Sequence, residues 1–192
     1  MFCGRLGGVF VRLRVVGAES LGVRGLSCFV DLDGFSVLVD VALGFSRFGL
    51  HPHPLQAVFS ELCKVRLASC WLGASCVVIT HLHGDHVPLF DANPFQFSLD
   101  VAGMLYRGVP LWVKAADDGV PYEKARFDSL CERFRGGVVA VDGGRSGFDG
   151  LLEFSGLYPH GLNEGVRVAA VRVGVEGDCV VHLSDTQLLV DE

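Results

Sequence analysis

The feature that most constrains this chain is a buried strand that runs directly into a cluster of histidines. Residues 75–80 read Ser-Cys-Val-Val-Ile-Thr, a short and nearly all-apolar run that is typical of a strand buried on both faces. His81-Leu82-His83-Gly84-Asp85-His86 follows at once, so we expect this cluster in the loop at the carboxyl end of the strand. Binding groups commonly gather there in layered α/β sheets.

The spacing inside the cluster favours metal binding. His81 and His83 are two residues apart, so an extended segment would place both rings on one side, where they can hold one metal ion. Gly84 permits a tight turn that would place Asp85 and His86 at a second position beside the first. Imidazole and carboxylate together suit zinc, and also iron or manganese. The alternative, polar loop residues near a core, fits poorly with three histidines and one aspartate in six residues, drawn from only 7 histidines in the chain.

Composition indicates a single globular domain, residues 1–192. Apolar residues make up 50% of the chain, charged residues 20%, and 25 residues are glycine, which suits a sheet-rich protein with many turns. The net charge of -6 argues against non-specific nucleic-acid binding without excluding a local basic groove. No run approaches the roughly 18 apolar residues of a membrane span. Seven scattered cysteines without a signal peptide indicate the cytoplasm.

Strand and helix signals alternate along the chain. Strands are expected at residues 8–16, 26–30, 35–39, 75–80, 109–113, 138–141, 151–154, 166–173 and 179–183. Turns at residues 31–34 and 176–178, each containing glycine, would make two hairpins. One helix begins at Pro54 and ends near Gly73, with an apolar face of Leu55, Val58, Phe59, Leu62 and Val65. A second covers residues 121–134. Strands in two sets, with helices between them, favour two sheets with helices outside.

Two later residues could add to the cluster. His160 follows Tyr158-Pro159 in a rigid turn that would aim its ring inward, and Asp185 sits just past an apolar strand. Taken alone, each is more typical of a turn than of a metal site. They are therefore candidate ligands only if residues 81–86 form a metal site.

Residues 80–86 resemble the signature of the metallo-β-lactamase superfamily. The resemblance implies a mixed α/β fold, the four-layer αββα sandwich, and a zinc-dependent hydrolase. Motif matching implies that His81, His83 and His160 hold one metal, that Asp85 and His86 hold the other, and that Asp185 bridges the two. It also implies that Asp40 supports the site from behind.

A closer resemblance extends over nearly the whole chain. Residues 19–24, 47–50, 113–114, 159–161 and 184–187 are similar to those of an uncharacterised family of archaeal metallo-hydrolases. Arg24 and Lys114 lie in these stretches and are candidates for binding an anionic substrate, although most such residues are simply solvated. The superfamily has one further histidine after the bridging aspartate, and none follows Asp185. We therefore expect a sandwich that is shortened at its C-terminus, with part of the second sheet uncovered and available for homo-oligomer formation.

The expected function is that of a metal-dependent hydrolase with one or two zinc ions. A metal-activated water would attack a carbonyl or phosphorus centre, and Asp85 would orient or deprotonate that water. A phosphodiester is favoured over a thioester or a lactone, because the motif is similar to that of ribonuclease Z. The alternatives are a non-catalytic or incomplete metal-binding protein, such as half of a split enzyme, and redox chemistry at a di-iron site.

Overall fold

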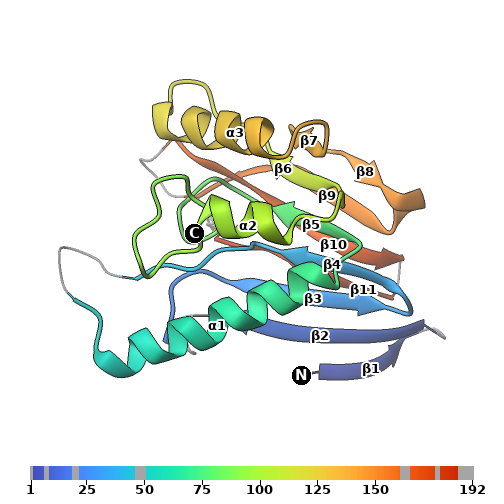
Figure 1. Cartoon of the computed structure of the whole chain (residues 1–192). Coiled ribbons are helices and arrows are strands. Elements are labelled where there is room, and N and C mark those ends of the chain that lie inside the picture. The colour runs from blue at the N-terminus through green and yellow to red at the C-terminus, as the bar shows by residue number, and fades with distance from the viewer. Residues whose placement is uncertain are drawn as a thin grey trace, which may run out of the picture.

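Two β-sheets pack face to face in the computed structural model, which describes residues 2–6, 9–18, 22–45, 51–160, 165–175 and 178–185 (Figure 1). The larger sheet contains, in spatial order, β1 (Phe2–Leu6), β2 (Val9–Gly17), β3 (Ser27–Leu32), β4 (Phe35–Val39), β5 (Cys76–Ile79), β6 (Leu111–Lys114) and β7 (Val138–Val141). Strands β1 to β4 pair antiparallel, and strands β4 to β7 pair parallel.

The smaller sheet is antiparallel. It contains β8 (Ser146–Gly147), β9 (Leu152–Pro159), β10 (Arg167–Val175) and β11 (Asp178–His182), and a single 3₁₀ turn at Phe148–Gly150 connects β8 to β9. Apolar side chains of the two sheets meet in one core, to which Val30 and Val78 contribute from the larger sheet and Phe154 and Val171 from the smaller.

Helices cover the other face of the larger sheet. They are α1 (Pro54–Leu72), α2 (Leu99–Leu105) and α3 (Pro121–Arg133), and Figure 1 shows all three on one side of the molecule. A second core, which includes Leu67, Trp71, Leu111 and Phe134, fills the space between them and the sheet. Because β5 lies between the two cores, all four of its residues are buried, as the nearly all-apolar run predicted.

The predicted mixed α/β fold is confirmed. Of the four layers expected for an αββα sandwich, three are present, because in the described ranges no α-helix covers the outer face of the smaller sheet. The hairpin between β3 and β4 is also confirmed, since Asp33 and Gly34 both have positive φ, as a tight two-residue hairpin turn requires. Residues 176–177 of the second predicted hairpin lie outside the described residues. Within the described residues, no helix is both long and apolar enough to cross a bilayer.

The predicted apolar face of α1 was wrong. Leu55, Val58, Phe59, Leu62 and Val65 are 47% to 68% exposed, whereas the buried residues are Ser60, Cys63, Leu67, Cys70 and Trp71. The helix carries apolar residues on two faces, and the face with Trp71 packs into the core between helices and sheet. Periodicity identified one apolar stripe but could not show which face meets the sheet.

Candidate metal centre

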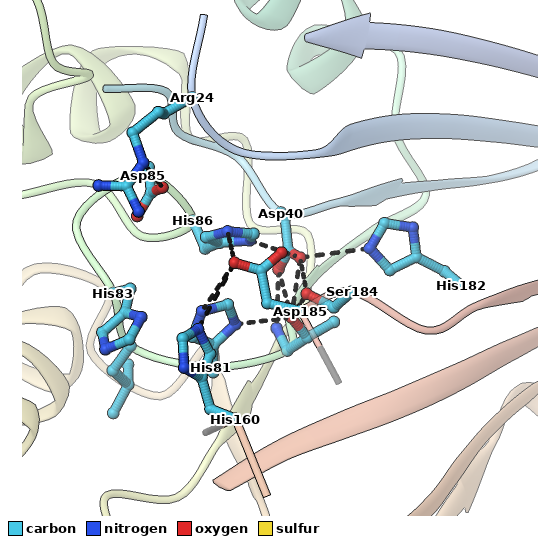
Figure 2. A network of polar contacts seen from close by, with 12 residues as sticks. Arg24, Asp40, His81, His83, Asp85, His86, His160, His182, Ser184 and Asp185 are labelled. Carbon is cyan, nitrogen blue, oxygen red and sulfur yellow. Dashed lines mark hydrogen bonds and ion pairs between the residues drawn. The ribbon is translucent and has the colours of Figure 1, made fainter. Parts of the chain in front are cut away.

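All the predicted ligands except Asp85 gather where strands of both sheets end (Figure 2). Asp40 directly follows β4, and residues 80–86 directly follow β5, its parallel neighbour. His160 directly follows β9, and Asp185 lies three residues beyond the end of β11. Since the two sheets face each other, residues that are distant in the sequence form one cluster.

Three histidines form a first group, which we call the three-histidine group: His81, His83 and His160. One ring nitrogen from each lies within 4.8 Å of the others. The ring centroids of His83 and His160 are 4.3 Å apart. Burial and the nearby charge of His86 lower the pKa of His81 well below its ordinary value. His81 is therefore neutral, which is the form that binds metal.

Asp185 joins the three-histidine group to His86. Its Oδ2 atom lies 3.2 Å from Nε2 of His86, 3.5 Å from Nε2 of His160 and 4.0 Å from Nε2 of His81. Hydrogen bonds to His160 and His86 hold the pKa of Asp185 well below its usual range. One ionised oxygen thus faces three imidazole nitrogens.

Asp40 is the centre of a second group, which we call the Asp40 group: Asp40, His86, His182 and Ser184. The carboxylate accepts hydrogen bonds from His86 Nδ1 at 2.9 Å, from Ser184 Oγ at 3.0 Å and from His182 Nε2 at 3.3 Å. It also accepts 2.8 Å hydrogen bonds from the amide and the hydroxyl of Thr80. Asp40 and Ser184 have φ values of 53° and 52°, a sparsely populated conformation that functional sites often retain.

The Asp40 group is charged although it is buried. Burial alone would raise the pKa of Asp40, but the charge of His86 and the hydrogen bonds from His182 and His86 hold that pKa well below its usual range. Burial alone would lower the pKa of both histidines, but Asp40, with help from Asp185 at His86, raises the pKa of His86 to about 10 and that of His182 to about 9. The carboxylate is therefore stabilised by two imidazolium rings.

The donor atoms of the cluster fit a metal ion. Nε2 of His81 is enclosed, yet it makes no hydrogen bond within the described part of the chain. Buried polar atoms without hydrogen bonds are rare, because each costs about 1–3 kcal/mol. Neighbouring imidazole nitrogens beside an ionised carboxylate are the donor set that zinc prefers. The cluster can therefore bind metal.

Asp85 and Arg24 lie beside the cluster. Oδ2 of Asp85 is 3.6 Å from Nε of Arg24, and Figure 2 shows this pair apart from the carboxylates of Asp40 and Asp185. The structure thus brings His86 to Asp185 but leaves Asp85 paired with an arginine. Both members of the pair line a cleft of about 420 Å³ that also includes His83.

Lys114 is not brought to the cluster, so its assignment to substrate binding was wrong. Its side chain is fully buried, and Nζ donates hydrogen bonds to Asp117 and, at 3.0 Å, to Oε2 of Glu123. Two carboxylates inside the protein compensate the ammonium charge, which leaves no role in holding an anion. Glu123 belongs to α3, so the interaction fixes the first turn of that helix.

The sequence reasoning missed Tyr122 and Arg126. The hydroxyl of Tyr122 lies 3.0 Å from Nε2 of His83, and Arg126 donates a hydrogen bond to the carbonyl oxygen of Leu82. Both lie in the helix that was expected at residues 121–134. Their spacing of four residues places them on one face of α3, but the sequence did not indicate that this face meets the histidine motif.

Comparisons with known proteins lead to archaeal relatives. No protein-family model matches the chain. The UPF0282 protein of Methanosarcina mazei is 32% identical over 183 residues, which cover 93% of this chain and 59% of that protein. The UPF0282 protein of Thermococcus onnurineus is 33% identical over 190 residues, which cover 93% of this chain and 63% of that protein. The chain therefore spans less than two thirds of the length of the curated relatives it matches.

These relatives are archaeal and uncharacterised, which confirms that part of the predicted resemblance. Residues 19–21, 47–50, 161 and 186–187, which contributed to it, lie outside the described residues. A solved structure from Thermotoga maritima, assigned provisionally to the metallo-β-lactamases, matches with a TM-score of 0.47 and 9% sequence identity, over 89% of this chain and 76% of that chain. The expected shortening at the C-terminus stays a prediction.

Proposed function

We propose that this chain is a metal-dependent hydrolase, with zinc as the favoured metal and a phosphodiester as the favoured substrate. The observation that carries the proposal is the position of Asp185, whose Oδ2 atom lies within 4.0 Å of Nε2 of His81, His86 and His160. An ionised carboxylate between imidazole nitrogens suits a site for one or two zinc ions.

The site residues divide between two metal positions. His81, His83 and His160 would hold one ion, His86 would hold the other, and Asp185 would lie between them. Asp85 would join His86 on leaving Arg24. Bound metal supplies Lewis acidity, which polarises the scissile group and lowers the pKa of water.

The chain itself orients these ligands. Asp40 binds Nδ1 of His86 and thereby aims Nε2 at Asp185, and Tyr122 contacts Nε2 of His83 and thereby restricts the orientation of that ring. Such partners fix the orientation of a ligating ring and raise its basicity. Asp85 would accept a hydrogen bond from the attacking water at a carboxylate oxygen, and so orient the water or take its proton.

A phosphodiester is favoured over a thioester or a lactone for two reasons. The motif at residues 80–86 is similar to that of ribonuclease Z, and the cleft beside the cluster contains the positive charge of Arg24. A phosphodiester is an anion, whereas thioester and lactone groups are neutral, so a cation beside the metal favours the first.

A second candidate is a metal-binding protein that is not catalytic by itself. The observation in its favour is the pairing of Asp85 with Arg24 at 3.6 Å, which leaves His86 and Asp185 as the ligands at the second position. If that pairing persists with metal bound, the second ion would be held weakly or not at all.

Hydrolysis of bis(p-nitrophenyl) phosphate by the zinc-loaded chain tests the proposal. We expect turnover that is lost on chelation, restored by zinc and abolished by His81→Ala. The matched control is His51→Ala, which removes an exposed histidine outside the cluster and should leave turnover unchanged. Zinc binding without hydrolysis of a phosphodiester, a thioester or a lactone would support the second candidate, and absence of zinc binding would overturn both.

A further inference from the structure

The cleft beside the metal cluster is lined by hydrogen-bond donors. It has a volume of about 420 Å³ and shares His83 and Asp85 with the histidine motif. Arg24, Gln96 and Arg126 also line it. These three side chains come from separate parts of the sequence, and only Arg24 was a candidate for substrate binding on sequence grounds.

Arg126 is held in place at the edge of the histidine motif. Its Nη1 atom donates a 2.6 Å hydrogen bond to the carbonyl oxygen of Leu82, and its guanidinium carbon lies 4.7 Å from the ring centroid of Tyr122. Within the described residues, its other nitrogens make no hydrogen bond or ion pair that meets the usual distance limits. Arginine stays charged at any physiological pH and carries five donors, so Arg126 presents a fixed positive charge to the cleft.

Gln96 presents its amide nitrogen to the same place. Its Oε1 atom accepts a 3.1 Å hydrogen bond from the backbone nitrogen of Asn93, which directs Nε2 away from that contact. A β-carbon on Gly84 would lie 3.3 Å from Nε2 of Gln96 and 3.7 Å from Nη2 of Arg126. Because residue 84 has no β-carbon, both donors can lie against the backbone of the histidine motif.

The cleft beside the histidine cluster and the larger cleft next to it differ in the net charge of their lining residues. The neighbouring cleft, between α2 and α3, has a volume of about 950 Å³ and contains Arg133 and Arg135. Three carboxylates, those of Asp100, Asp128 and Glu132, line it as well. The cleft beside the metal cluster has two arginines and a single carboxylate, Asp85. Only the smaller of these two clefts has an excess of positive charge.

We propose that this cleft binds a phosphoryl group of the substrate, with Arg24 and Arg126 as its charged partners and Gln96 as a neutral donor. Two guanidinium groups and an amide offer donors from three side chains, which suits a tetrahedral phosphoryl group with several oxygens better than a planar carboxylate with two. The inference rests on the proposed function, because the phosphoryl group is taken to belong to the substrate of the hydrolase. Binding of that group to the cleft can be measured without turnover.

Binding of dimethyl phosphate to the purified chain, followed by ³¹P NMR titration, tests this inference. Arg126→Met and Arg24→Met should each weaken binding roughly 10- to 100-fold, since each removes a charged hydrogen-bonding partner. Arg133→Met is the matched control, because it removes an arginine of the same helix that faces the neighbouring cleft and should leave the affinity unchanged. Neutral trimethyl phosphate and acetate should bind at least tenfold more weakly than dimethyl phosphate.

His81→Ala separates this inference from the proposed function. The variant should lose metal, as elemental analysis would show, yet keep most of its affinity for dimethyl phosphate. If affinity is lost in His81→Ala and kept in both arginine variants, the anion binds the metal and the inference is wrong. Arginine-dependent binding by a chain that hydrolyses no phosphodiester would support the cleft and overturn the proposed function alone. Thermal unfolding of each variant shows whether a loss of affinity comes from the missing side chain or from a loss of folding. If Arg126→Met does not fold, Arg24→Met tests the inference.

Discussion

The three-histidine group and the Asp40 group, the two halves of the metal cluster, differ in the protonation state of their buried histidines. In the three-histidine group, His81 is neutral and its Nε2 atom lies 4.0 Å from Asp185 without a normal hydrogen bond. In the Asp40 group, His86 is protonated, with its pKa raised to about 10, and is already bonded to Asp40. Metal can enter the first half directly, whereas binding by His86 must release a proton. We therefore predict that the first half binds metal more tightly and that the second half mainly stabilises the fold.

The largest expected effect concerns the free energy of unfolding. Asp40→Ala leaves His86, His182 and Thr80 without the carboxylate that they share. Removing one partner from a buried ion pair costs about 3–5 kcal/mol, and urea unfolding of the metal-free chain would measure the loss. His83→Ala changes the other half and should cost under about 1 kcal/mol, because His83 is only partly buried. Equal losses in the two variants would remove the distinction between the halves.

The next effect concerns metal affinity. His81→Ala should weaken zinc binding at least about 100-fold, since it removes a ligand outright, whereas substitutions around ligands typically cost 10- to 100-fold. Asp185→Ala should lower the number of bound ions from two to one and leave the tighter ion in place. Competition with a chelator, together with elemental analysis, measures both. Loss of all metal in Asp185→Ala would show that the carboxylate, and not the three-histidine group, controls binding.

Local patterns predicted the fold better than contacts between distant segments. The nearly all-apolar residues 75–80 predicted a strand buried on both faces, because burial on two sides favours apolar residues at successive positions. β5 is buried at all four positions. The motif that follows likewise placed His81 and His83 side by side, since their spacing is fixed by the backbone. Helix α2 and strand β8 were not predicted, because each is short and its stability comes from packing rather than from its own periodicity.

Contacts between distant segments determine the roles of several side chains that the local sequence pattern does not predict. Lys114 and Arg24 looked equivalent as candidates for substrate binding, yet one is fully buried between carboxylates and the other lines the cleft. His182 is close in sequence to Asp185, but it binds Asp40 from the other side. The direction in which a side chain points depends on which segments pack together, and a single sequence does not encode that in local pattern.

Stability of the metal-free chain should depend on pH through the Asp40 group. The pKa values of His86 and His182 are raised to about 10 and about 9 in the folded protein, from about 6.5 when unfolded. Their contribution is therefore fully present below pH 6.5 and is lost as the pH rises toward 9–10. Asp40, whose pKa is lowered, contributes above about pH 4 and loses this contribution in stronger acid.

Urea unfolding at pH 6.5 and at pH 9.5 would measure this dependence. Stability should fall over the interval, and His182→Gln should reduce the fall because it removes one of the two titrating rings. Saturating zinc should reduce it too, since a histidine that binds metal is already deprotonated. A fall that is unchanged in His182→Gln would show that other groups control stability in alkali.

The smallest expected effect is on zinc affinity, and it concerns a residue that contacts the three-histidine group without binding metal itself. Tyr122→Phe removes only the hydroxyl that lies 3.0 Å from Nε2 of His83, and the ring that stacks beside it stays. The orientation of His83 would then be less restricted, so zinc affinity should fall by up to about tenfold, at the low end for partners of metal ligands. Chelator competition measures the change, and Tyr106→Phe, whose tyrosine lies outside the cluster against Phe134, is the matched control. A loss as large as that of His81→Ala would mean that Tyr122 contributes more than orientation, and that the three-histidine group depends on its hydroxyl as the Asp40 group depends on its carboxylate.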